Sequence, residues 1–338
     1  MSNLCQEITL PTDPISHIDD DGGEIALCIL SAINVGKLRN LNEMEELCDL
    51  AVRGLEELID YQKYPVKAAE RSTLARRSLG VGYIGLAHYL AKNGYNYSDQ
   101  GAWDLVHKLS ESFQFNLLKA SNAIAMEKGA CEGFQHTKYA DGILPIDTYK
   151  SEVDEISNVE LEYDWNSLRE SIKQFGLRHS TLSAQMPSES SSVVSNATNG
   201  IEPPRDYLSI KKSKKGPLKQ IVPGFPYLKN KYTLLWEMPS NEGYIKIVAV
   251  MQKFFDQAIS GNWSYNPGNY PDNEVPSSVM AMDLLNTYKY GWKTSYYQNT
   301  YDNKKDGEEE PTVQITNNVD QLVNELLEAE EDCDSCKV

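Results

Sequence analysis

Short apolar runs alternate with long amphipathic stretches, and this alternation limits the fold most. The mostly apolar run 24–30 follows the turn 19–23, as expected of a buried parallel-type strand. From Asn42 to Tyr61 apolar residues recur at helical spacing, which predicts a helix with one buried face. Similar patterns predict helices over 72–92, 101–128, 164–175, 229–236, 243–259 and 277–290, and a last strand over 293–299. A chain of 338 residues can form one large α/β barrel or two or three domains.

The charge balance is acidic, with 32 Lys and Arg against 49 Asp and Glu and a net charge of −17. Such a chain is a poor partner for nucleic-acid backbones or anionic membranes. We also see no apolar run long enough to cross a bilayer and no secretion signal. We therefore expect a cytoplasmic protein with no nucleic acid and no membrane as partner. Its six cysteines are expected to be reduced thiols with catalytic or redox roles.

The N-terminal motif Asn3-Leu4-Cys5-Gln6-Glu7 is the first candidate site. In an extended or looped backbone, residues two apart share a face. Asn3, Cys5 and Glu7 could therefore point at one small molecule, offering a reactive sulfur, a general base and a hydrogen-bonding group. The alternative is a buried structural cysteine between polar surface residues.

Two further motifs have a glycine or serine pattern. Gly80-Val81-Gly82-Tyr83-Ile84-Gly85 has the spacing of a dinucleotide-binding fingerprint, but the fingerprint requires a preceding strand. We place these glycines inside the helix 72–92, where they permit close packing or a break.

A serine-rich helix start is predicted at Ser188, Glu189, Ser190, Ser191 and Ser192. A helix start rich in hydroxyl groups leaves backbone N–H groups that can bind phosphate, or simply water.

Residues 301–338 are acidic and poor in aromatic residues, which predicts a flexible tail. It ends in Cys333-Asp334-Ser335-Cys336, and two thiols at this spacing readily form a redox pair. Half of a metal site is the alternative. No second cysteine pair exists and the histidines show no ligand spacing, so we predict no metal site and favour the redox role.

Taken together and in order, these motifs resemble the large (α) subunit of class I ribonucleotide reductase, of the aerobic bacterial and phage type. The resemblance includes Tyr296-Tyr297, residues 142–149 and residues 195–204. It covers essentially the whole chain but only the C-terminal half of the family's protein. It implies half of a ten-stranded α/β barrel over 1–300, with a small α+β insertion around 137–222, followed by the redox tail.

The resemblance also implies a role for each motif residue. Cys5 would carry a thiyl radical, Glu7 would act as base and Asn3 would hold the sugar hydroxyls. Cys28 would be one of two thiols that reduce the ribose, and the serine-rich helix start would bind the substrate diphosphate. Tyr296 and Tyr297 would pass the radical in, while Cys333 and Cys336 would regenerate the active-site thiols. Stacking of the adjacent tyrosines requires an irregular strand, because neighbours on a regular strand face opposite ways.

The partners implied by the family are a small (β) subunit with a diiron-tyrosyl radical, thioredoxin or glutaredoxin, and a ribonucleoside diphosphate substrate. This chain would bind no cofactor itself, and nucleotide effectors would bind mainly the N-terminal part. The family's second reducing thiol is absent here. Met1 directly before Ser2-Asn3 suggests a split or truncated large subunit that needs an N-terminal fragment.

Ser190 and the close spacing of Cys333 and Cys336 also depart from many members, with little expected effect. Two alternatives to the reductase remain: a non-catalytic assembly fragment, and a stand-alone dithiol oxidoreductase that uses the tail thiols.

Overall fold

Five extended segments run side by side in parallel. The computed structural model describes residues 1–20, 22–213 and 216–301. Within it, β1 (Ile29–Asn34) pairs with β2 (Leu79–Ile84), and β5 (Gly261–Tyr265) pairs with β6 (Ser295–Thr300). Residues 181–185 lie between the two pairs, bridged to β2 at Ser183 and to the start of β5 at Gln185. The order is therefore β1, β2, 181–185, β5, β6, as in an α/β fold with a parallel sheet.

The middle segment is irregular because side chains replace part of its backbone ladder. The Asp256 carboxylate accepts the N–H groups of Leu182 (2.8 Å) and Ser183 (3.1 Å). The Gln185 side chain accepts the N–H of Tyr83 and donates to its carbonyl, both at 3.0 Å. Hence this central segment meets its neighbours through bridges rather than a continuous strand, while its buried polar groups remain paired.

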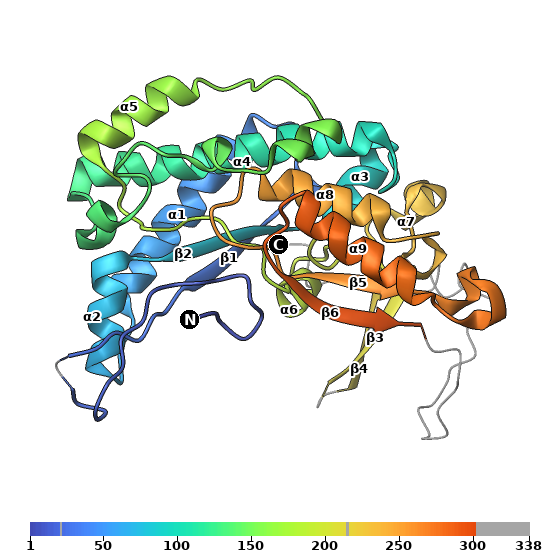
Figure 1. The fold of residues 1–338 in the computed structure, drawn as a ribbon, viewed down its shortest axis with the longest axis horizontal. Coiled ribbons are helices and arrows are strands. Elements are labelled where there is room, and N and C mark those ends of the chain that lie inside the picture. The colour runs from blue at the N-terminus through green and yellow to red at the C-terminus, as the bar shows by residue number, and fades with distance from the viewer. Residues whose placement is uncertain (21, 214–215, 302–338) are drawn as a thin grey trace, which may run out of the picture.

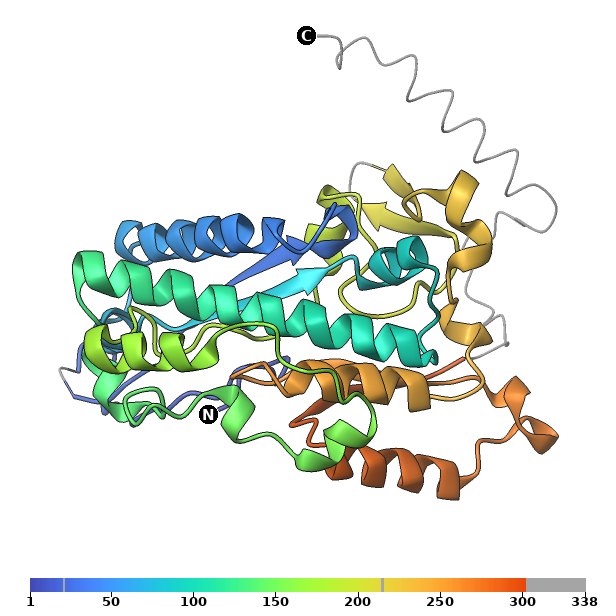
Figure 2. The ribbon, with the colours of Figure 1, turned by 90° about the horizontal axis from the view of Figure 1, so that it is seen from above.

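The long helices cover one face of these segments. α1 (Glu43–Tyr61) packs on α4 (Gln100–Lys128), which also contacts α5 (Trp165–Phe175) and α8 (Glu242–Gln252). Figure 1 shows the helices on one side of β1 and β2 and the N-terminal loop on the other, and Figure 2 shows α1, α4 and α5 lying next to one another. The remaining elements are α2 (Lys67–Arg76), α3 (Leu86–Asn93), α6 (Glu189–Val194), β3 (Leu208–Ser213), β4 (Gly216–Ile221), α7 (Phe225–Leu228), α9 (Ser277–Lys289) and short 3₁₀ turns.

Two apolar clusters reflect the two faces of the sheet. The large cluster joins the helices to β2, with Leu79, Val81 and Tyr83 fully buried. A small cluster on the other side consists of Ile8, Leu10 and Ala184, with Ala26 and Cys28 packed against it. Burial of apolar surface thus fixes the N-terminal loop to the sheet.

The expected helix over 72–92 is wrong. α2 ends at Arg76, β2 occupies Leu79–Ile84, and α3 begins at Leu86. The glycine motif therefore lies on a strand, where a side chain at Gly80 would collide with Leu30 and Ile8, and one at Gly82 with Ala184. Gly80 permits close approach of the N-terminal loop, and Gly82 permits close approach of residues 181–185. Tertiary contacts decide this arrangement, and local helix propensity does not.

Other boundaries also move. The strand expected at 24–30 is found at Ile29–Asn34, because pairing with β2 selects its register, and Cys28 immediately precedes it. Residues 229–236 form 3₁₀ turns and extended chain rather than one helix, and the helix expected to reach 259 ends at Gln252. Helices over 42–61, 101–128, 164–175 and 277–290 and the last strand are confirmed within a few residues. The predicted tail lies outside the described residues, apart from Tyr301.

Candidate active site

The N-terminal motif forms a tight loop with Cys5 near its tip. The backbone N–H of Asn3 donates to the carbonyl of Ile8 (3.0 Å), and the N–H of Gln6 donates to the carbonyl of Asn3 (3.2 Å). The Asn3 side-chain oxygen also accepts the N–H of Ile8 at 3.1 Å. Gln6 adopts a positive φ of 66°, as the reversal of the chain requires. We call residues 3–8 the finger loop.

Asn3 and Glu7 meet as the motif suggested. The Asn3 amide donates to Glu7 Oε1 at 2.8 Å, and the Ser260 hydroxyl lies 2.9 Å from Glu7 Oε2. Glu7 is only 1% exposed, so both carboxylate oxygens exchange water for protein donors. A buried carboxylate held in this way is a suitable general base for a substrate bound nearby.

Cys5 faces a pair of tyrosines instead of Glu7. Its thiol donates to the hydroxyl of Tyr296 at 3.6 Å, and the Tyr296 hydroxyl donates to that of Tyr297 at 3.1 Å. The tyrosine rings lie with centroids 4.0 Å apart at 41°. The contacts with Tyr297 and Cys5 raise the pKa of Tyr296. The three side chains thus form a continuous path from sulfur to an exposed phenol, since Tyr297 is 57% exposed.

The irregular strand that this pair requires is present. The register between β5 and β6 shifts between the pairs Gly261↔Ser295 and Trp263↔Gln298, so β6 has one extra residue where Tyr296 and Tyr297 lie. A β-bulge of this kind turns neighbouring side chains toward the same side. The N–H of Tyr297 donates to the Asn262 side chain at 2.9 Å, which stabilises the irregularity.

Cys28 lies at the foot of the finger loop. It lines a cavity of about 740 Å³ together with Asn3, Ile8 and Leu10. Burial, and then the charges of Asp256 and Glu7, raise the pKa of the Cys28 thiol, so it rests as a protonated thiol. Cys48 is buried in the helical core, and the described cysteines Cys5, Cys28, Cys48 and Cys131 are all free thiols.

The serine-rich segment begins α6, three residues after Gln185. Ser188 is buried and its hydroxyl donates back to the Met186 carbonyl at 3.1 Å, so it does not cap the helix. Ser192 is buried, and its hydroxyl accepts the N–H of Gly200 at 3.4 Å, while Ser190 and Ser191 are exposed. The first N–H groups of such a helix have no intrahelical acceptor.

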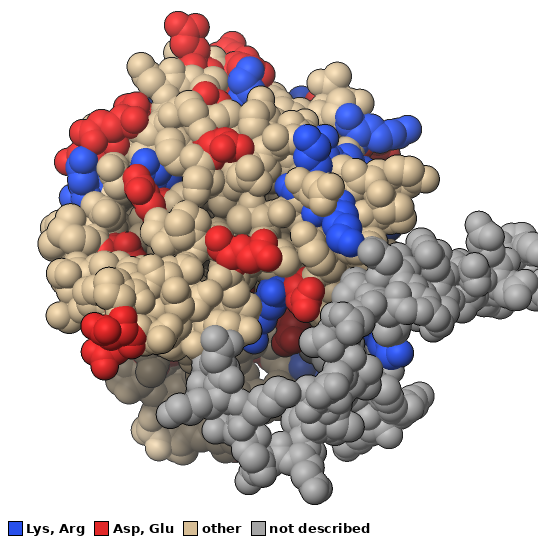
Figure 3. Space-filling view, turned by 90° about the vertical axis from the view of Figure 1, so that its right-hand side faces the viewer, with Lys and Arg blue, Asp and Glu red and all other residues tan. Residues whose placement is uncertain are grey.

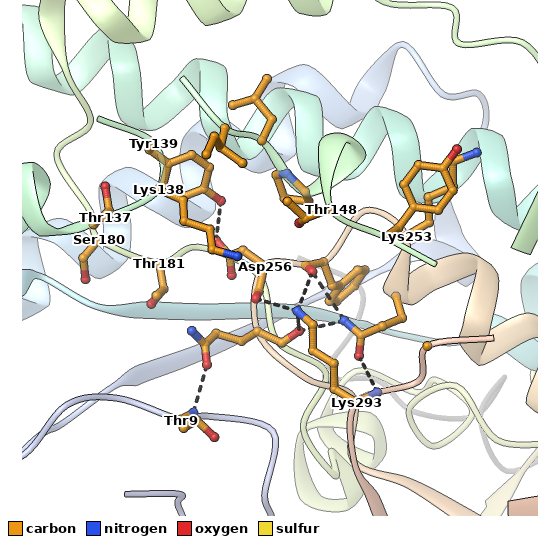
Figure 4. Close-up of a pocket in the computed structure, with 18 of the residues that line it drawn as sticks. Thr9, Thr137, Lys138, Tyr139, Thr148, Ser180, Thr181, Lys253, Asp256 and Lys293 are labelled. Atoms are coloured by element: carbon orange, nitrogen blue, oxygen red, sulfur yellow. Dashed lines mark hydrogen bonds between the residues drawn. The ribbon is translucent and has the colours of Figure 1, made fainter. Parts of the chain in front are cut away.

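Several residues that anchor the finger loop were not found from sequence. Thr294 donates its hydroxyl to the Gln6 carbonyl (3.2 Å), the Ala258 N–H donates to the Glu7 carbonyl (2.8 Å), and the Gln257 side chain accepts the Thr9 N–H (2.9 Å). Gln257 and Thr9 also line a cavity of about 530 Å³, shown in Figure 4. They carry no motif, and only the meeting of the loop with β5 and β6 reveals them.

Hydrogen bonds hold Asp256, which lines the cavity in Figure 4, in place. Lys293 donates to the carbonyl oxygen of Asp256 at 2.9 Å, and the Tyr139 hydroxyl donates to the Asp256 carboxylate at 2.8 Å. Burial raises the pKa of Asp256 and lowers that of Lys293. Because Asp256 also binds residues 182 and 183, this network holds the start of β5 against the middle segment.

Comparison with known proteins identifies the family. A family model described as "ribonucleotide reductase, barrel domain" matches residues 1–298. The chain belongs to the ribonucleotide reductase barrel-domain family. It is 60% identical over 309 residues to the ribonucleoside-diphosphate reductase subunit alpha of Haemophilus influenzae, and 57% identical over 315 residues to the ribonucleoside-diphosphate reductase 1 subunit alpha of Escherichia coli. The alpha subunit of phage T4 is 44% identical over 305 residues.

These matches cover 91%, 93% and 89% of this chain but 41%, 41% and 40% of the relatives. The chain therefore spans about two fifths of the reductase subunits that it matches. Within the described residues, no helix is long and apolar enough to cross a membrane. Over the same part of the chain, no group of three or more His, Cys, Asp or Glu side chains could hold a metal ion. Cys333 and Cys336 lie outside the described residues.

Proposed function

We propose that this chain supplies the catalytic part of the large subunit of an aerobic ribonucleoside-diphosphate reductase. The observation that carries the proposal is the contact path Tyr297–Tyr296–Cys5, which ends in the loop that also holds the Asn3–Glu7 pair. Hydroxyl and thiol groups in hydrogen-bond contact can exchange a hydrogen atom with little rearrangement. The path therefore connects the protein surface with the sulfur of Cys5, in the same loop as the buried Glu7.

The proposed chemistry assigns one step to each group. The thiyl radical on Cys5 removes the ribose 3′ hydrogen, while Glu7 accepts the proton of the 3′-hydroxyl and Asn3 holds the sugar hydroxyls. The 2′-hydroxyl leaves as water. Cys28 and a second thiol supply two electrons and become a disulfide, and Cys5 returns the hydrogen to C3′. The raised pKa of Cys28 suits this step, since the thiol must arrive with its proton.

Substrate phosphate is assigned to the start of α6. The backbone N–H groups of its first turn carry no side-chain cap, and such groups attract anions. The helix follows directly on the segment whose Gln185 carbonyl accepts the N–H of Ser260 at 2.9 Å. Ser260 in turn contacts the finger loop. The start of α6, assigned to the phosphate, and the finger loop, assigned to the sugar, are therefore both connected to Ser260.

The open edges of the sheet support the need for the rest of the large subunit. Among the described residues, β1 and β6 each have a strand partner on one side only. Leu27 and Leu30, at or next to β1, are 38% and 41% exposed. Unpaired strands with apolar neighbours bind further strands, and we propose that the N-terminal part of the large subunit completes a ten-stranded barrel here. It would also supply the second reducing thiol and most of the effector-binding regions.

The surface of α9 supports a second partner. Its polar residues Asp283 and Thr287 are buried, whereas Leu284, Leu285 and Tyr288 are 56%, 58% and 73% exposed. An apolar face that points outward marks an interaction site, and α9 is linked to β6 where the Gln298 amide contacts Met280 sulfur at 3.8 Å. We assign this face of α9 to the small subunit, whose diiron-tyrosyl radical would reach Tyr297.

On the side of the molecule shown in Figure 3, acidic and basic side chains are interspersed.

The experiment that tests the proposal is reconstitution. This chain, an N-terminal large-subunit part, a diiron-tyrosyl small subunit, thioredoxin or glutaredoxin and a nucleotide effector should together convert ribonucleoside diphosphates to deoxynucleotides. Omission of either protein partner should abolish the product, and Cys5→Ser should abolish it with assembly intact, because an O–H bond is too strong for a tyrosyl radical to break readily.

The alternatives predict other results. A non-catalytic assembly fragment gives a complex without product, and a stand-alone dithiol oxidoreductase acts without either partner. Deoxynucleotide formation with no N-terminal part present would refute the requirement for a completed barrel.

A further inference from the structure

Ser260 is a buried residue that contacts two parts of the finger loop at once. Its hydroxyl oxygen lies 2.9 Å from Glu7 Oε2 and also contacts the backbone carbonyl oxygen of Cys5. Its own backbone is fixed, because its N–H donates to the Gln185 carbonyl at 2.9 Å. The side chain is 7% exposed, so the hydroxyl must find its partners within the protein.

The two contacts compete for one hydrogen. A serine hydroxyl has a single O–H donor, and both an ionised carboxylate and a peptide carbonyl are acceptors only. When Glu7 is ionised, the charged oxygen is the stronger acceptor and takes the hydrogen. When Glu7 is protonated, Oε2 accepts more weakly, and the hydrogen turns toward the Cys5 carbonyl. The hydroxyl rotates, and no proton leaves Ser260.

We propose that Ser260 is a positioning residue that couples the protonation of Glu7 to the peptide of Cys5. It steadies the charged base before proton abstraction, and it holds the radical-bearing loop once the base has taken the proton. The inference rests on the proposed function in that Glu7 is taken as the base. It adds Ser260, the residue directly before β5, to the site. Ser260 touches neither the substrate nor the radical and acts through Glu7 and the Cys5 peptide.

The test is a set of variants in the reconstituted complex. Ser260→Ala should lower kcat by about tenfold or more with a smaller change in KM, since loss of one donor to a charged group is worth a factor of that order.

Three controls separate this role from simple packing. Ser260→Thr retains a hydroxyl and Ser260→Cys retains a weaker donor of similar size, so at least one should recover part of the rate. Ser264→Ala removes a hydroxyl from β5 for which the described residues provide no hydrogen bond, and should behave as wild type. A wild-type rate in Ser260→Ala, or a KM that rises as much as kcat falls, overturns the proposal.

Failure of the proposed function would look different, because the wild-type complex would then make no deoxynucleotide. In that case the melting temperatures of Ser260→Ala, Glu7→Gln and the double variant test whether Ser260 and Glu7 are coupled. A double variant whose loss in Tm is smaller than the sum of the single losses supports the Ser260–Glu7 coupling. Additive losses overturn it.

Discussion

Cys5, Tyr296 and Tyr297 contact one another in a single line, and this makes single-atom substitutions informative. The phenol oxygens of Tyr296 and Tyr297 are 3.1 Å apart, and the Cys5 sulfur lies 3.6 Å from the first. Replacing tyrosine by phenylalanine retains the ring contact but removes the O–H that must be oxidised. At this scale the site depends on individual hydrogens, whereas the surrounding packing stays the same.

We predict that Tyr296→Phe and Tyr297→Phe each reduce deoxynucleotide formation to the level of Cys5→Ser, with substrate binding unchanged. Tyr301→Phe is the matched control, because this tyrosine follows β6 and stacks on Trp236 with centroids 5.1 Å apart. Product formation and nucleotide affinity would be measured side by side. Normal turnover in either of the first two variants removes that residue from the path.

At the scale of elements, the finger loop and β2 fit together because β2 contains glycines. A Cβ added to Gly80 would lie 2.6 Å from Leu30 Cδ2 and 3.1 Å from Ile8 Cδ1. Ile8 belongs to the loop that carries Cys5 and Glu7, so a change on the strand is transmitted to the site. The close approach therefore links the packing of β2 to the positions of Cys5 and Glu7.

We predict that Gly80→Ala lowers the free energy of unfolding by about 1–3 kcal/mol through overpacking and also lowers turnover by displacing the finger loop. Gly54→Ala in α1 is the control, since nothing lies within 4 Å of a Cβ there. It should stabilise the protein by about 0.5–1 kcal/mol. Denaturant unfolding and turnover of both variants test this, and equal behaviour of the two would exclude the contact as the cause.

At the scale of the whole molecule, buried titratable groups join distant parts of the chain. Glu56 in α1 binds Arg77, Arg178 and His179 at 2.7, 2.7 and 3.1 Å. Burial raises the pKa of Glu56, but the hydrogen bonds from these three residues outweigh it and lower the pKa below 4.5. Burial also lowers the pKa of His179. This cluster connects α1 with the starts of β2 and the middle segment.

His107 gives a sharper prediction for acid stability. It is fully buried in α4 against Phe254, and neither ring nitrogen has a hydrogen-bond partner among the residues that the structure describes. Burial, and then Lys253, lower its pKa from 6.5 to about 4. The unfolded chain therefore binds a proton in this window when the folded one does not, and stability is lost as the pH falls from 6.5 toward 4.

We expect His107→Leu to remove about 2–3 kcal/mol of the stability loss between pH 7 and 4.5. Urea unfolding at the two pH values measures it. An unchanged pH dependence in the variant would show that His107 does not contribute.

The cysteines Cys333 and Cys336 test the proposed redox role of the tail. We predict that Cys333→Ser and Cys336→Ser stop multiple turnover with thioredoxin or glutaredoxin, because a terminal dithiol would carry electrons to the buried disulfide. A small dithiol that enters the site directly should restore turnover in both variants, and Cys48→Ser, which alters a buried core thiol, should need no such rescue. Failure of the small dithiol would assign these cysteines another role.

Local periodicity was sufficient to predict the helices over 42–61, 101–128, 164–175 and 277–290, because one buried stripe of each recurs at helical spacing. The N-terminal motif indicated the Asn3–Glu7 pair, since its residue types suit one chemistry, and the resemblance to the family implied the grouped tyrosines. The sequence did not show that residues 79–84 form a strand, because Gly80 and Gly82 are required only where the finger loop and the middle segment 181–185 pack closely against them. It gave no sign of Ser260, which reaches Glu7 across 253 positions. Long-range pairing decides such contacts: they depend on which strands meet, and no local pattern records that choice.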